Sequence, residues 1–230
     1  MLLLTPYHHT VSSLAAAEAV LTRQQKESGT LLLDIGAGTT NLVVLEDGEV
    51  QHVGVIPIGG MHITNDLAIG LKTDLEIAEA VKIQYGGLSQ AVKKKNISVT
   101  YNGQKHDFDA EEAQMIIEAR VDELLELVDK ELKKVGKSQK LPGGVVLVGG
   151  TSKLPGIDEV AKERLRLSAR IGSLQPIGGL QDNVNDVSYS TAVGLTVLDM
   201  LLYPGVQTHS GQYGKAVNSI FNKLMGRLKK

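Results

Sequence analysis

Two glycine-containing turns carry the residues of this 230-residue chain that could bind a ligand, and the first follows an apolar run at residues 31–33. Its candidate binding residues are Asp34, Gly36, Gly38, Thr39 and Thr40. Glycines let backbone N–H groups approach phosphate oxygens, threonine hydroxyls can donate to them, and a carboxylate can hold hydrated Mg²⁺. The segment lacks the third glycine and following helix of a dinucleotide-binding turn and the Gly-Lys-Ser/Thr of a P-loop. The segment predicts a hairpin that binds phosphate. The alternative is that Gly36 and Gly38 only allow a tight turn and bind no ligand.

The second turn follows the apolar run 144–148 and contains Gly149, Gly150 and Thr151. It repeats the order of the first segment, a buried strand followed by glycines and hydroxyl residues, and then leads into a helix. Each turn is expected to end a buried strand on the same edge of the sheet, so their exposed N–H groups should converge on one cleft. Two such turns in one chain favour a site for phosphate or sugar groups over turns that serve shape alone.

Hydrophobic periodicity indicates the elements that must position these turns. Short apolar runs predict strands at residues 30–35, 42–46 and 50–58, and Asp47-Gly48 predicts a two-residue hairpin between the second and the third. We therefore expect three consecutive antiparallel strands. Apolar residues at helical spacing, with terminal signals, predict helices at 11–23, 60–71, 73–85, 109–136, 157–167 and 188–202.

Local turn and cap signals refine this arrangement. Thr73 with Glu76 predicts a capping box, Asp109 with Glu112 predicts the start of a long amphipathic helix, and Asn102-Gly103 predicts a second hairpin. The order of elements indicates a mixed α/β domain. We expect this domain at residues 30–202 with a smaller α/β subdomain inserted at about 60–109, after an N-terminal segment, 1–29, that contains a connecting helix.

Composition excludes several classes of function. The absence of cysteine removes disulfide scaffolds, zinc fingers, iron–sulfur clusters and thiol nucleophiles. With 3% aromatic residues, no tryptophan and a net charge of −2, a nucleic-acid platform is not expected. The histidines show no metal-binding spacing, and there is no nucleophile elbow. Apolar runs are too short for a signal peptide or a spanning helix, which favours a cytoplasmic protein.

Residues 214–230 differ from the rest of the chain in charge. They hold five of the 24 basic residues and none of the 26 acidic ones, which leaves a net charge of −7 on the remainder. On a helical wheel, the apolar side chains occupy one arc and the basic ones the opposite arc. The apolar set is Val217, Ile220, Phe221, Leu224, Met225 and Leu228, and the basic set includes Lys223 and Arg227.

This segregation predicts an amphipathic helix at 214–230 that lies on an anionic membrane surface, after a Gly- and Ser-containing linker at 203–213. A C-terminal helix docked on the body of the protein would also be amphipathic and is the alternative. The linker and the absence of acidic residues favour the membrane surface.

Several segments together resemble a known family. The pair of turns is similar to the phosphate-2 and adenosine segments of the actin, Hsp70 and sugar-kinase ATPase superfamily. Within that superfamily the chain resembles the FtsA family of bacterial cell-division proteins over most of residues 13–202. The matching segments are Ala19 to Thr22, Ile56 to Gly60, Thr64 to Leu67, Ala78 to Lys82 and Tyr189 to Leu195.

The resemblance implies an actin-like fold that binds ATP and Mg²⁺. It implies that the first turn, from Asp34 to Thr40, lies at the phosphates with Asp34 at the metal, and that the second, from Gly149 to Thr151, lies along the adenosine. It also implies that Glu79 and Lys82, which share a helix face, lie near the ribose and base. As partners it implies an FtsZ-like division protein, bound in the inserted subdomain, and the inner face of the membrane.

The departure from the superfamily is as informative as the match. Only 33 residues precede Asp34, too few for the first phosphate-binding domain, so we expect the second half of such a protein. Hydrolysis of ATP by this chain alone is then not expected, and an exposed face should lead to self-association or to binding of an N-terminal half. The alternatives are a PilM-like platform for pilus assembly and half of a kinase or ATPase that needs its other domain.

Overall fold

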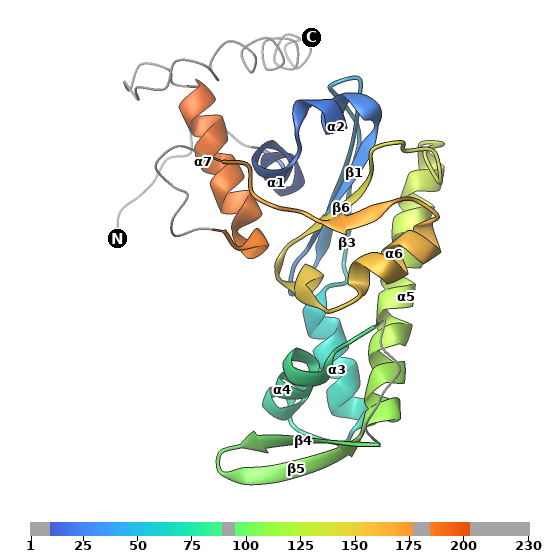
Figure 1. Cartoon of the computed structure of the whole chain (residues 1–230), viewed down its shortest axis with the longest axis vertical. Coiled ribbons are helices and arrows are strands. Elements are labelled where there is room, and N and C mark those ends of the chain that lie inside the picture. Colours follow the sequence, from blue (N-terminus) through green and yellow to red (C-terminus); the bar gives the residue numbers. More distant parts are fainter. Residues whose placement is uncertain (1–9, 89–94, 177–184, 203–230) are drawn as a thin grey trace.

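A five-stranded mixed sheet forms the centre of the computed structural model, which describes residues 10–88, 95–176 and 185–202 (Figure 1). The strand order is β3-β2-β1-β6-β7. The antiparallel strands β1, β2 and β3 are joined to β6 and β7 by parallel pairing of β1 with β6. Their bounds are β1 Thr30–Ile35, β2 Thr40–Glu46, β3 Glu49–Ile56, β6 Gly144–Val148 and β7 Ala169–Ile171.

Turn chemistry explains the hairpin between β2 and β3. Asp47 and Gly48 both adopt positive φ, 54° and 71°, as the two central residues of a type I′ turn require. This hairpin and the three antiparallel strands were predicted correctly. The second strand begins two residues earlier than expected, at Thr40, and the third ends at Ile56.

Helices cover both faces of the sheet, because alternate residues of its buried strands point to opposite sides (Figure 1). On one face Leu32 packs in a cluster with α1 (Ser12–Val20) and α7 (Ser190–Leu202). On the other face Leu31 and Leu33 pack in a larger cluster with α5 (Ala110–Lys134) and α6 (Ile157–Leu165). The mixed α/β fold expected from the sequence is confirmed.

The segment between β3 and α5 forms a second group of elements at one end of the molecule (Figure 1). It contains α3 (Gly60–Gly70), α4 (Leu75–Tyr85) and a separate two-stranded sheet of β4 (Asn96–Tyr101) and β5 (Gln104–Asp109). Helix α5 packs against α3 and reaches back to the large sheet. The division into a main domain and an inserted subdomain stays a prediction. The predicted linker at 203–213 and helix at 214–230 lie outside the described residues.

Two details of the expected secondary structure were wrong. The helix at 11–23 is broken, because Thr22 forms a capping box with Gln25 and starts α2 (Arg23–Ser28). Thr73 does not cap α4, because its N–H bonds to Ala68 at the end of α3, and Asp74 occupies the N-cap position instead. Two short 3₁₀ helices, η1 (Gly150–Lys153) and η2 (Val187–Tyr189), were not predicted. Among the described residues, no helix combines the length and apolar character needed to cross a membrane.

Candidate functional site

The two glycine turns lie side by side, because their strands β1 and β6 are parallel neighbours. The Thr151 hydroxyl of the second turn donates to the Gly36 carbonyl of the first at 2.9 Å. Gly149 has a φ of 87°, and a Cβ there would lie 2.5 Å from both Asp34 Oδ1 and the Ile35 carbonyl oxygen. Only glycine allows this approach, so the second turn closes directly onto the carboxylate of the first.

The tip of the first turn is exposed, and its base is buried. Gly36 N–H donates to the Thr39 carbonyl at 2.9 Å, which leaves Ala37, Gly38 and Thr39 facing solvent. A Cβ on Gly38 would meet no atom within 4 Å. Thr40 is fully buried, and its hydroxyl donates to the Ile58 carbonyl at 2.8 Å, so this side chain supports the turn from beneath.

Asp34 is half-buried at the junction of three elements. Its Oδ2 accepts a hydrogen bond of 2.9 Å from the Thr191 hydroxyl, at the start of α7 and 157 residues away in the sequence. Burial raises the pKa of the Asp34 carboxyl, and the Thr191 hydrogen bond opposes that rise. A cation beside Asp34 would offset the cost of burying its charge. A single carboxylate fits Mg²⁺ that takes its other ligands from water and phosphate.

Helix α3 joins the site through two glycines whose role the sequence reasoning missed. Gly60 N–H donates to the Gly36 carbonyl at 2.9 Å. A Cβ on Gly59 would lie 2.6 Å from the Gly36 and Ala37 carbonyl oxygens, and a Cβ on Gly60 would lie 2.4 Å from Thr151 Oγ1. The Gly-Gly pair at the start of a helix was the available signal, because close approach of backbones demands such residues.

Glu79 and Lys82 on α4 are brought to the same region by α3. They form an ion pair of 2.6 Å. Lys82 Nζ also donates to the Gly60 carbonyl at 3.1 Å and to the Thr64 hydroxyl at 2.8 Å. Gly60 also donates its N–H to Gly36 of the first turn and packs against Thr151 of the second. This one residue therefore connects the ion pair to both glycine turns. The set of residues expected at a nucleotide is therefore contiguous, although their contact with a nucleotide stays a prediction.

Comparison with known proteins identifies the family. The chain matches the family described as "Cell division protein FtsA" over residues 31–194. It belongs to the FtsA family. It is 36% identical to the cell division protein FtsA of Pseudomonas aeruginosa over 215 residues, which cover 90% of this chain and 49% of that protein. It is 42% identical to that of Bacillus subtilis over 186 residues, which cover 79% and 41%. The chain thus spans about half the length of these relatives.

Solved structures show the actin-like fold. MreB5 of Spiroplasma citri bound to ADP matches with a TM-score of 0.67 at 17% identity, covering 85% of this chain and 60% of that one. The PilM-PilN type IV pilus biogenesis complex matches with a TM-score of 0.56 at 22% identity, covering 81% and 50%. At these identities the likeness concerns the fold alone.

In this FtsA-family chain the start of α7 is tied to the second turn. Asp186 forms an ion pair with Lys153 of η1 and accepts from the Ser188 N–H, and these partners lower the pKa of Asp186 to about 2. Gly194 packs so closely that a Cβ would lie 1.8 Å from the Ala15 carbonyl oxygen of α1. The segment from Ser190 to Gly194 therefore packs α7 closely on α1.

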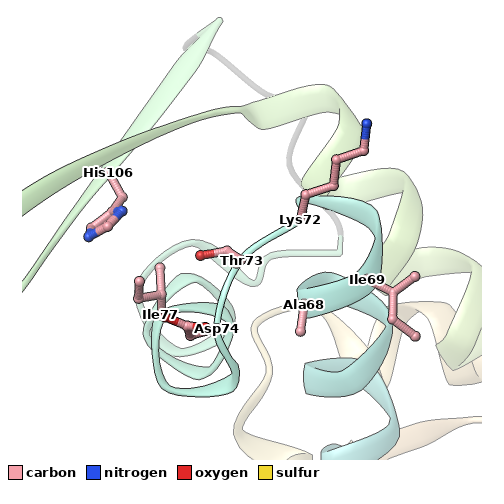
Figure 2. A pocket seen from close by; sticks show the side chains of 7 residues that line it. All are labelled: Ala68, Ile69, Lys72, Thr73, Asp74, Ile77 and His106. Carbon is pink, nitrogen blue, oxygen red and sulfur yellow. The ribbon is translucent and has the colours of Figure 1, made fainter.

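An open pocket of roughly 560 Å³ lies apart from the glycine turns (Figure 2). The end of α3 and the start of α4 form one side, and His106 of β5 lies opposite. Ala68, Ile69 and Ile77 supply its apolar surface, and Lys72, Thr73 and Asp74 supply polar groups. None of the residues predicted to contact a nucleotide lines this pocket, so it is a feature of the second group of elements.

Proposed function

We propose that this chain is the part of an FtsA-type division scaffold that contacts Mg·ATP through its two glycine turns. The observation that carries the proposal is their convergence, through the Thr151 to Gly36 hydrogen bond and the contact of Gly149 with Asp34. MreB5 of Spiroplasma citri, which shares the fold, is bound to ADP in its crystal structure. The match to the FtsA family favours this function over a PilM-like platform or an enzyme.

In this proposal the exposed backbone of Gly38 and Thr39 receives the phosphates, and Gly149, Gly150 and Thr151 lie along the adenosine. Bound Mg²⁺ would neutralise phosphate charge, and Asp34 would hold it through its carboxylate. Phosphate oxygens on the far side would still face water. We therefore propose binding without hydrolysis for the chain alone, and hydrolysis only if a second domain supplies the remaining polar groups.

Equilibrium binding of Mg·ATP to purified protein tests this site. Asp34→Ala should weaken binding by tenfold or more and leave the folded structure intact, since it removes one side-chain hydrogen bond, that from Thr191, together with a charge that is costly to bury. Asp158→Ala, which removes a carboxylate from the first turn of α6, is the matched control. Equal affinities for the parent and Asp34→Ala would refute the assignment of Asp34.

We further propose that residues 214–230 tether the protein to the cytoplasmic membrane as a surface helix. Support comes from the sequence, in which apolar and basic residues occupy opposite arcs. Phe221→Glu should abolish co-sedimentation with anionic liposomes, and raised salt should weaken it. Ser219→Glu places the same charge in the middle of the basic arc and should weaken pelleting far less. Pelleting that survives both Phe221→Glu and deletion after Gly214 would exclude this role.

The proposed division partner, an FtsZ-like polymer, would contact the elements between β3 and α5. The pocket beside Ile69 supports this placement, because it is open to solvent and combines polar groups with a smaller apolar surface. Ile69→Glu should reduce co-pelleting with the polymer. Ile83→Glu is the matched control, since both isoleucines are more than 70% exposed and only Ile69 lines the pocket. Equal effects of the two substitutions would place the contact elsewhere.

A further inference from the structure

Thr64 is a buried hydroxyl group with three polar neighbours. It lies on α3, is 1% exposed, and its Oγ1 contacts the Gly60 carbonyl at 3.2 Å, Lys82 Nζ at 2.8 Å and the Glu79 carboxylate. A hydroxyl has one proton to donate and can accept from an ammonium group. The carboxylate is the stronger acceptor, so Thr64 donates to Glu79 while it accepts from Lys82.

Lys82 uses all of its donors within the protein. Its three ammonium protons match three acceptors, the Gly60 carbonyl, the Thr64 hydroxyl and Glu79 Oε2, at 3.1, 2.8 and 2.6 Å. Its side chain is only 12% exposed. In this arrangement Lys82 has no proton left for a ligand, which differs from the role near the base that the family resemblance implied.

Glu79 has the opposite character. Its side chain is 40% exposed, and its bonds to Thr64 and Lys82 both use Oε2. Within the described part of the chain, Oε1 accepts no hydrogen bond. Glu79 Oε1 is therefore the acceptor that Thr64, Glu79 and Lys82 together leave available to a ligand. The two hydroxyl groups of a sugar can donate hydrogen bonds to such a carboxylate oxygen.

We infer that Thr64 is a positioning residue, which together with Lys82 fixes one oxygen of Glu79 so that the other can accept from the ribose hydroxyls of ATP. This inference rests on the proposed nucleotide site. Gly60 connects the two, because it bonds both to Lys82 and to Gly36 of the first turn. Without the Thr64 hydroxyl, Lys82 alone holds Oε2, and a carboxylate that is 40% exposed can rotate about that single contact, so the outward oxygen loses its fixed direction.

The test compares ATP with 2′,3′-dideoxy-ATP, which lacks the ribose hydroxyls. The parent should bind ATP more tightly, and Thr64→Val should reduce that preference about tenfold while it changes the affinity for the dideoxy nucleotide little. Thr64→Ser keeps the hydroxyl and should retain the preference within about twofold. Thr30→Val is the matched control, because Thr30 is also fully buried and donates to a backbone carbonyl, that of Gln25, away from the site.

Other outcomes overturn the inference. If Thr64→Val lowers the affinity for both nucleotides equally, Thr64 serves folding alone. If the parent binds both nucleotides equally well, Glu79 does not contact the ribose, although ATP binding stands.

If the parent binds neither nucleotide, the proposed function fails, and thermal unfolding then tests the positioning by itself. Thr64→Val should lower the unfolding temperature by at least twice as much in the parent as in Glu79→Ala, because the hydroxyl has lost its acceptor in the second background. Equal decreases would refute the positioning role.

Discussion

Burial raises the pKa of the Asp34 carboxyl group, whereas a bound cation would lower it. The pKa is raised by burial, so the folded state binds the proton more tightly than the unfolded state, whose value is 3.8. The ionised group therefore costs stability above the folded pKa, and this cost is lost as the pH falls through the folded pKa. Asp34→Asn should raise the free energy of unfolding at pH 7, with a smaller effect at pH 4, even though it weakens Mg·ATP binding.

Urea unfolding of the parent and Asp34→Asn at both pH values measures this difference. Asp158→Asn, in the first turn of α6 and away from the two glycine turns, serves as the control for the change of one partly exposed carboxyl group. Destabilisation by Asp34→Asn at pH 7 would show that the Thr191 hydrogen bond outweighs the cost of burial.

Gly60 and Thr151 lie so close together that only glycine fits at position 60 without a shift of Thr151. Gly60→Ala should destabilise the protein by about 1–3 kcal/mol, because the new Cβ would lie 2.4 Å from Thr151 Oγ1. Thr151→Ala removes the obstructing oxygen, so the double variant should be more stable than the sum of the single effects predicts. Free energies of unfolding for the four proteins provide the measurement. Strict additivity would mean that the two residues do not meet.

The helices α4 and α5 form a natural comparison, because each begins after an aspartate. Asp109 accepts from the N–H groups of Glu111 and Glu112 at 2.9 and 3.0 Å, whereas Asp74 makes no capping bond through its side chain. Asp109→Ala should therefore cost about 1 kcal/mol and Asp74→Ala a few tenths. Chemical unfolding of the two variants checks this. Equal losses would indicate a helix-dipole effect in place of capping.

Elements with strong local signals were predictable from the sequence, and long-range contacts were not. Asn102-Gly103 correctly predicted the hairpin between β4 and β5, because the turn requires positive φ at both central residues and Asn and Gly adopt it readily. The break at Thr22 and the unused cap at Thr73 depended on which neighbour each threonine met. Glu79 and Lys82 were paired correctly by helix spacing, but Thr64 joined them only through the packing of α3 on α4.

Exposed apolar residues bear on whether the protein associates with other chains. Tyr189, the last residue of η2, and Leu195 of α7 are 55% and 46% exposed, and α7 packs against α1. We expect this face to cause self-association or to bind a complementary N-terminal half. Leu195→Glu should shift the protein toward the monomer in light scattering. Met115→Glu, at a site on α5 that is 63% exposed, is the control. A parent that stays monomeric at high concentration would contradict this.

The parallel pairing of β1 with β6 also bears on how the chain folds during synthesis. Strand β1 ends at Ile35 and β6 begins at Gly144, so more than a hundred residues emerge between two neighbours in the sheet. At ~5–20 residues per second, one edge of β1 waits roughly 5–20 s for its partner. Antiparallel β2 and β3 can form in the meantime, because they follow directly. An open strand edge is a template for pairing with another nascent chain, so this interval is when a chaperone would protect the protein most.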